Sequence, residues 1–222
     1  MKYIRLVMFG VFSLIHLYDS FFDNSRARKK TKPFLLLFLT LFYLLAAREK
    51  NYLLVSALVF SWLGDVLLIP KGDKWFFRGG IAFGISHLLF IAQYIPHIAF
   101  DRIPWVAVIP AAVIYFGISF IIIEIIKPTT PKSMLFPMYL YLLCNSAMNL
   151  FSFNQLLQHR NLGATLALIG AILFFLSDCA LFIVRYGKHP QIVYRKHFTV
   201  MLAYLLGEFL IVLGMLKLTG QL

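Results

Sequence analysis

Residues 56–69 read SALVFSWLGDVLLI, an apolar run that contains a single acid, Asp65. A charged side chain at the centre of a membrane helix costs about 2.5–3.5 kcal/mol or more, so it is rare and marks a functional site by default. Asp178 lies in a similar setting far downstream, in AILFFLSDCALFI. We therefore predict that the two acids form a site and that the rest of the chain is the membrane scaffold around it.

The composition is that of a membrane protein. Of the 222 residues, 61% are hydrophobic and only 14% are charged, and the mean hydropathy is +0.82. A soluble domain of this size could not bury so much apolar side chain, and the apolar runs lack the period-two alternation of barrel strands. The predicted fold class is all-α, a polytopic membrane bundle that forms one integral-membrane domain over residues 1–222.

Eight apolar segments predict about eight transmembrane helices. Proline is common at the start of a helix, so Pro33, Pro104 and Pro137 are expected to open three of the spans. The expected spans cover roughly residues 3–22, 33–47, 52–69, 79–98, 104–126, 135–155, 163–184 and 198–217.

The net charge of +12 would indicate nucleic acid as a partner in a soluble protein. Here the basic residues lie in short loops between apolar runs, so membrane lipids are the expected partner and nucleic acid is not. The loops after the first, third, fifth and seventh spans carry twice as many lysines and arginines as the rest of the chain. The positive-inside rule then places these loops on the cytoplasmic side and both termini on the other.

This topology makes the third and seventh spans parallel and brings Asp65 and Asp178 to nearly the same depth. SWLGDVLLI and FFLSDCALF share a small-Asp-x-x-Leu pattern, which predicts a four-plus-four parallel internal repeat. Small residues also recur within single spans, where they favour close approach of a neighbouring helix. They are Gly80 and Gly84 in the fourth span, and Gly163, Gly170 and Ser177 in the seventh.

Other polar residues inside the spans are candidates to support the site. His87 follows Gly80 and Gly84 on one helix face, and Asn145, Asn149 and Ser152 form one polar stripe. For each of these residues, a structural hydrogen bond between helices is the competing interpretation.

The last predicted span holds a third intramembrane acid, Glu208, one turn after Tyr204, and both residues are further candidates to support the site or bind the substrate. Too few histidines and cysteines converge within the spans for a zinc site, so no metal is expected. The two cysteines, Cys144 and Cys179, both fall inside predicted spans and offer no disulfide framework.

Four blocks of sequence between about residues 53 and 214 resemble the YhhN-like lysoplasmalogenase family of multi-pass membrane proteins. The blocks are SALVFSWLGDVLLI, FFRGGIAFGISHLLFIAQY, LGATLALIGAILFFLSDCALFI and FTVMLAYLLGEFLIVLG. Members usually read Tyr-x-x-Ala-Gln in the last span, whereas this chain reads Tyr204-Leu-Leu-Gly-Glu208.

The resemblance implies a hydrolase without a cofactor that cleaves the vinyl-ether bond of lysoplasmalogens drawn from the bilayer. The products would be a fatty aldehyde and glycerophospho-ethanolamine or -choline, and Asp65 and Asp178 would be the catalytic residues. The host membrane would be the endoplasmic reticulum for a eukaryotic chain and the inner membrane for a bacterial one.

Paired acids suit this reaction, because protonation of the alkene gives an oxocarbenium-like cation that water then captures. Glycosidases use two carboxyl groups for a reaction that passes through a similar cation. Two close carboxyl groups titrate in separate steps, so one can act as acid and the other as base. Supporting roles then fall to His87 at a carboxylate or the water, to Asn145 and Asn149 at the glycerol or headgroup, and to Lys74, Arg78 and Arg185 at the phosphate.

Two other functions fit the same residues. Paired intramembrane acids also serve as proton or cation sites in transporters of small solutes. The third interpretation is a catalytically silent membrane protein that binds lysolipid. It stays open because Glu208 stands where family members usually have Gln.

Overall fold

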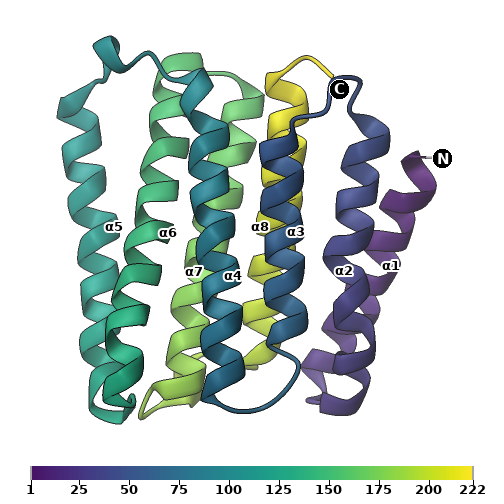
Figure 1. The fold of residues 1–222 in the computed structure, drawn as a ribbon, viewed down its shortest axis with the longest axis vertical. Helices are drawn as coiled ribbons and strands as arrows, with labels where there is room; N and C mark the ends of the chain where they lie inside the picture. Colours follow the sequence, from purple (N-terminus) through teal and green to yellow (C-terminus); the bar gives the residue numbers. More distant parts are fainter. Residues whose placement is uncertain (1, 222) are drawn as a thin grey trace.

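The computed structural model describes residues 2–221 and, over that range, consists of helices and connecting turns without a strand (Figure 1). The all-α prediction is therefore confirmed. The eight α-helices are α1 (Lys2–Phe21), α2 (Ser25–Ala46), α3 (Tyr52–Leu67), α4 (Asp73–Tyr94), α5 (Trp105–Ile126), α6 (Lys132–His159), α7 (Leu162–Tyr186) and α8 (His197–Leu218).

Within the described residues, six of these helices are long and apolar enough to cross a membrane, namely α1, α4, α5, α6, α7 and α8. The apolar helix α3 is shorter, with 16 residues. Helix α2 opens with SRARKKTK, which lowers its hydropathy. The chain is thus a multi-pass membrane protein, and among its described helices α2 is more polar and α3 shorter than the other six.

Three helices begin three or more residues earlier than predicted. Helix α2 begins at Ser25 rather than at residue 33, with the Asn24 side chain accepting a hydrogen bond from the Ala27 amide. Helix α4 begins at Asp73 rather than at 79, and α6 at Lys132 rather than at 135. Lysine and arginine are good helix formers, so a helix can extend beyond the apolar run that revealed it.

Two prolines therefore do not open helices as predicted. Pro33 lies inside α2 and Pro137 inside α6, whereas Pro104 does sit at the N-cap of α5. The Pro33 carbonyl oxygen accepts a hydrogen bond from Trp62 Nε1 on α3 at 2.7 Å. This hydrogen bond ties α3 to α2 beside the proline.

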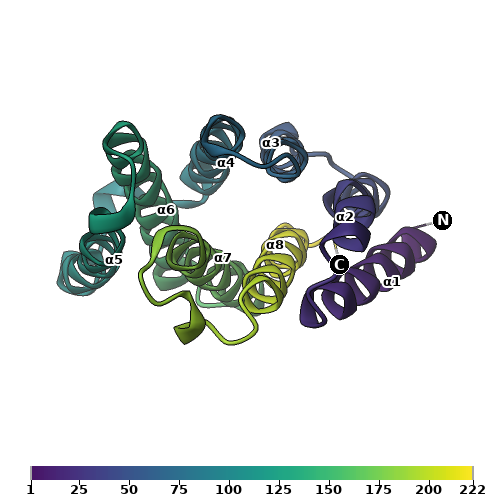
Figure 2. The ribbon, with the colours of Figure 1, turned by 90° about the horizontal axis from the view of Figure 1, so that it is seen from below.

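Six helices form a ring, and two lie outside it (Figure 2). The ring order is α2, α3, α4, α6, α7 and α8, each packed on the next, while α1 packs on α2 and α8, and α5 on α6 and α7. In the apolar stretches of α1 and α5, only 22% and 17% of the residues are buried, against 61% in α8, as expected for outer helices.

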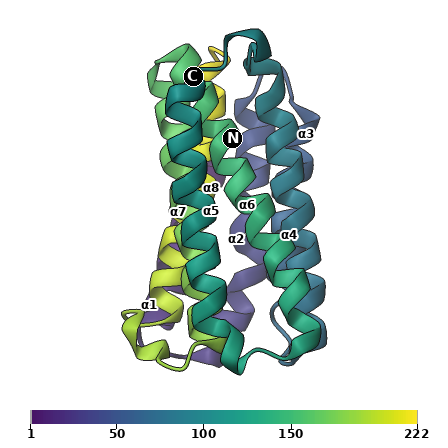
Figure 3. The ribbon, with the colours of Figure 1, turned by 90° about the vertical axis from the view of Figure 1, so that its left-hand side faces the viewer.

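The helices alternate in direction along one axis, so α3 and α7 run parallel (Figure 1, Figure 3). The ring order is the one that a repeat of α1–α4 by α5–α8 would produce. The outer helices break this symmetry, because α1 contacts α8 whereas α5 contacts α7 rather than α4. The internal repeat itself stays a prediction.

Close packing of α7 through its small residues is confirmed. A Cβ atom added at Gly170 would lie 2.5 Å from the Gly207 carbonyl oxygen of α8, and one added at Gly163 would lie 2.5 Å from the Leu218 nitrogen. The Ser177 hydroxyl donates to the Val200 carbonyl oxygen at 2.9 Å. Only glycine allows the two backbones to approach this closely.

The matching prediction for α4 is wrong. A Cβ atom added at Gly80 or Gly84 would meet nothing within 4 Å. These glycines line an open groove instead of a helix contact. The neighbouring Gly79 is the one that packs closely, with an added Cβ 2.7 Å from the Leu68 side chain.

Candidate active site

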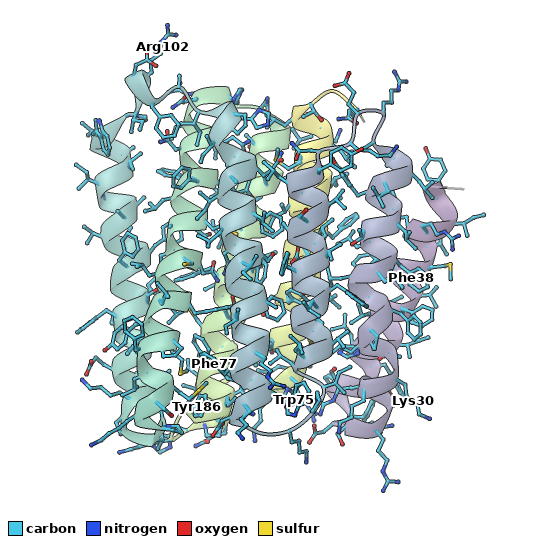
Figure 4. All side chains as sticks on the ribbon, viewed as in Figure 1. Lys30, Phe38, Trp75, Phe77, Arg102 and Tyr186 are labelled. Carbon is cyan, nitrogen blue, oxygen red and sulfur yellow. The ribbon has the colours of Figure 1, made fainter. Side chains whose placement is uncertain are left out.

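Asp65 and Asp178 line the same cavity, which has a volume of about 340 Å³. The two acids come from α3 and α7, on opposite sides of the ring, and are only 2% and 5% exposed. Both acids lie in the second half of their helices, which end at Leu67 and Tyr186, and Figure 4 labels Tyr186 at the end of the bundle opposite Arg102. The arrangement agrees with the prediction that parallel helices bring the acids to one depth.

Asp65 is paired with a cation. Lys32 Nζ lies 3.3 Å from Asp65 Oδ1, and the Tyr204 hydroxyl donates to Oδ2 at 2.9 Å. The Lys32 side chain is 16% exposed, so the ion pair is largely shielded from water. Sequence reasoning missed Lys32, because it was counted with the loop charges. Lys32 could have been considered on the ground that a buried carboxylate needs a compensating positive charge nearby.

Asp178 is held by neutral donors. The Tyr141 hydroxyl and Asn145 Nδ2 both donate to Asp178 Oδ2 at 2.7 Å. Asn149 Nδ2 in turn donates to Asn145 Oδ1 at 3.1 Å, which fixes the orientation of the Asn145 amide. Tyr141 was also missed from the sequence, although it extends the polar stripe of α6 by one turn toward the N-terminus.

His87 lies beside Asp178 without a hydrogen bond to it. Its Nε2 atom is 3.6 Å from Asp178 Oδ2, and among the described residues neither ring nitrogen has a hydrogen-bond partner. The ring is fully buried and packs against Phe174 and Tyr141, with centroids 4.9 and 5.1 Å apart. His87 is therefore close enough to pair with Asp178 after a small shift.

Each acid is contacted in an equivalent way by the ring. Asp65 on α3 meets Lys32 from the preceding helix α2 and Tyr204 from α8. Asp178 on α7 meets Tyr141 and Asn145 from the preceding helix α6, and His87 from α4. Helices in equivalent positions of the ring thus surround the two aspartates. They supply a cation to Asp65 and neutral donors to Asp178.

The basic residues near the cavity differ from those predicted. Arg185 lines it, and its guanidinium donates to Asp73 at 2.9 Å. Lys74 and Arg78 are exposed and do not line it, and Arg78 lies over the Trp75 ring, 4.9 Å from the centroid. Among the described residues, the basic side chains that do line the cavity are Lys32, Arg185 and His197.

Glu208 also lies outside the cavity lining. It is one turn beyond Tyr204 on α8 and is fully buried. Among the described residues, neither of its carboxyl oxygens has a hydrogen-bond partner. Of the predicted site residues, the structure thus gathers Asp65, Asp178, His87, Asn145, Tyr204 and Arg185 at or against the cavity, with Asn149 behind Asn145.

A second, apolar cavity of about 390 Å³ runs between α4 and α6. Phe77, Ile81 and Phe136 line it and are exposed on the outer surface of the bundle, so it opens sideways toward lipid. Tyr141, the donor to Asp178, lines it as well. The residues that line both cavities are Leu68, Phe76, Phe83 and Leu181.

These features define what the site can do chemically. Two carboxyl groups in different electrostatic surroundings can divide the roles of proton donor and proton acceptor. The cavity that holds them adjoins a groove suited to a hydrocarbon chain and carries cations suited to an anionic group.

Comparison with known proteins gives one match. Residues 27–215 match the family model described as the YhhN family, a range that includes both aspartates and every side chain shown to contact them. No match is found among curated proteins or among solved structures.

Proposed function

Because the chain belongs to the YhhN family, we propose that it is a membrane hydrolase that cleaves the vinyl-ether bond of lysoplasmalogens. The observation that carries this proposal is that two acids share one cavity whose walls continue into an apolar groove open to lipid. The alkenyl chain would lie in the groove and the glycerol in the cavity. The phosphate would be held by Lys32 and Arg185, whose charges face the cavity.

Asp178 is the proton donor in this mechanism. Its described contacts are neutral, and Tyr141 and Asn145 both occupy Oδ2, which leaves Oδ1 to carry the proton. Transfer of that proton to the distal alkene carbon converts the vinyl ether into an oxocarbenium ion. His87, 3.6 Å from Oδ2, lies where it can help to orient the carboxyl group.

Asp65 is the carboxylate, because Lys32 compensates its charge. It stabilises the oxocarbenium ion and takes a proton from the water that attacks the carbon next to the ether oxygen, which gives a hemiacetal. The hemiacetal then collapses. The bond between the hemiacetal carbon and the glycerol oxygen breaks. Asp65 returns its proton to the glycerol oxygen, and the hemiacetal hydroxyl gives its proton to Asp178. One water is consumed, and both carboxyl groups are restored.

The test is aldehyde release from lysoplasmenylethanolamine by purified protein in lipid nanodiscs. Asp65→Asn and Asp178→Asn should each abolish release while the protein keeps its thermal unfolding midpoint. Near-normal turnover in either variant would remove that residue from the mechanism. Solute flux in proteoliposomes without any aldehyde would instead support a transporter.

A further inference from the structure

Phe83 on α4 lies where the two cavities meet. Together with Leu68, Phe76 and Leu181, it lines both the cavity of the acids and the apolar groove. A lipid whose chain lies in the groove and whose glycerol lies in the cavity would therefore place its vinyl ether beside these side chains. Phe76 and Phe83 are the aromatic residues among the four, and the face of an aromatic ring attracts positive charge.

The Phe83 ring is fixed between the surroundings of the two acids and is only 6% exposed. The ring of Tyr204, whose hydroxyl donates to Asp65, has its centroid 5.8 Å from that of Phe83. The ring of Phe174, one turn before Asp178 on α7, has its centroid 6.1 Å away. Phe83 is thus one ring contact away from residues next to each acid.

Gly64 makes room for this ring. A Cβ atom added there would lie 2.6 Å from two ring carbons of Phe83, so a larger residue would push the ring aside. The equivalent position before Asp178 is occupied by Ser177, whose hydroxyl donates to the Val200 carbonyl oxygen instead. The glycine before Asp65 therefore lets the Phe83 ring pack directly against α3.

Phe76 is less suited to meet a positive charge from the substrate. The guanidinium carbon of Arg185 already lies 4.5 Å from its ring centroid. Among the described residues, no lysine or arginine lies over the Phe83 ring in this way. Phe83 is therefore the aromatic residue at this junction that is not already paired with a cation.

The reaction develops a positive charge in a cavity whose own cations oppose it. Lys32, Arg185 and His197 line the cavity, and Lys32 compensates the charge of Asp65. Asp178 becomes a carboxylate as it gives up its proton and attracts the cation, but Lys32 weakens the attraction exerted by Asp65. An aromatic ring can add stabilisation without adding a charge that needs compensation.

We propose that Phe83 is a catalytic residue whose ring stabilises the oxocarbenium ion; this inference rests on the proposed function. When Asp178 protonates the distal alkene carbon, the π electrons of the alkene form the new carbon–hydrogen bond. The positive charge is then shared by the ether oxygen and the carbon next to it, and the ring attracts this charge without forming a bond. Because the vinyl ether is uncharged before the step, the attraction raises kcat rather than lowering KM.

Fluorinated phenylalanines at position 83 test this role, because each fluorine withdraws electron density from the ring face while changing its size little. In the full-length protein in nanodiscs, kcat for aldehyde release should fall stepwise through the mono-, di- and trifluoro variants. The total loss should be about 30-fold, equivalent to about 2 kcal/mol, with little change in KM. The matched control is Phe90, which is fully buried two turns further along α4 and lines neither cavity. The same series there should leave kcat unchanged.

A kcat that stays constant or rises along the series at Phe83 would overturn the proposal, and so would an equal fall at both positions. Gly64→Ala gives a second test, because it displaces the ring. It should lower kcat in the wild type and cause no further loss in Phe83→Leu, and equal losses in both backgrounds would contradict the role. No aldehyde from the wild type would overturn the proposed function and this inference with it. Aldehyde release with a constant series at Phe83 would overturn the inference alone.

Discussion

Lys32 and Asp65 form an ion pair, at 3.3 Å, inside the cavity that also holds Asp178. Among the described residues, no lysine or arginine pairs with Asp178, which is contacted instead by Tyr141, Asn145 and His87. This difference supports the distinct roles proposed for two acids that look alike in the sequence. The first prediction concerns this ion pair.

Lys32→Met should destabilise the protein, because it leaves the Asp65 carboxylate buried and uncompensated. Breaking a fully buried pair costs about 3–5 kcal/mol, and we expect about 1–3 kcal/mol here because the ammonium is partly exposed. The free energy of unfolding measures this. The exposed Lys30→Met is the control and should change stability by no more than about 0.5 kcal/mol.

A double-mutant cycle separates the pair from other effects of Lys32. In Asp65→Asn the cation has lost its partner, so adding Lys32→Met should cost much less than it does in the wild type. Additive losses would show that Lys32 stabilises the fold through contacts other than Asp65.

Tyr141→Phe should lower kcat about 10–100-fold with little change in KM, because Asp178 loses one of two donors that orient its carboxyl group. Steady-state kinetics of aldehyde release measure this. Tyr139→Phe is the matched control, since it lies on the same helix, is 38% exposed and does not line either cavity. Similar rates in the two variants would mean that Tyr141 does not position Asp178.

Gly84→Leu should block the apolar groove without disturbing the fold, since a Cβ there meets nothing within 4 Å. Displacing about two methylenes at about 0.8 kcal/mol each raises KM for a long alkenyl chain by roughly tenfold or more. A short-chain analogue should be hydrolysed as by the wild type. Gly117→Leu on α5, also with open space around its Cβ, should affect neither substrate. A chain-independent loss in Gly84→Leu would place the hydrocarbon elsewhere.

The helices and the two acids could be predicted because both signals are local. Long apolar runs reveal helices whatever they pack against, and a lone acid in such a run stands out by its cost. Counting residues along parallel spans predicted nearly the same depth for Asp65 and Asp178, and the two acids line one cavity. None of these inferences needed a knowledge of neighbouring helices.

The partners of the acids depend on contacts between helices, which the sequence does not display. Lys32 is one of several cations in the run RARKKTK, and the start of α2 at Ser25 decides which of them turns inward. The glycines show the same limit. Gly170 meets a glycine of α8, whereas Gly84 faces a groove, although both occur in similar patterns.

The sideways opening of the apolar groove between α4 and α6 has a kinetic consequence. A substrate that arrives through the bilayer is sampled by lateral diffusion, so its mole fraction in the membrane, rather than its bulk concentration, sets how often the site is filled. Diluting it with inert lipid at constant total substrate should slow the enzyme. The membrane would thus deliver the lipid substrate, and the polar cavity that holds the two acids would deliver the water.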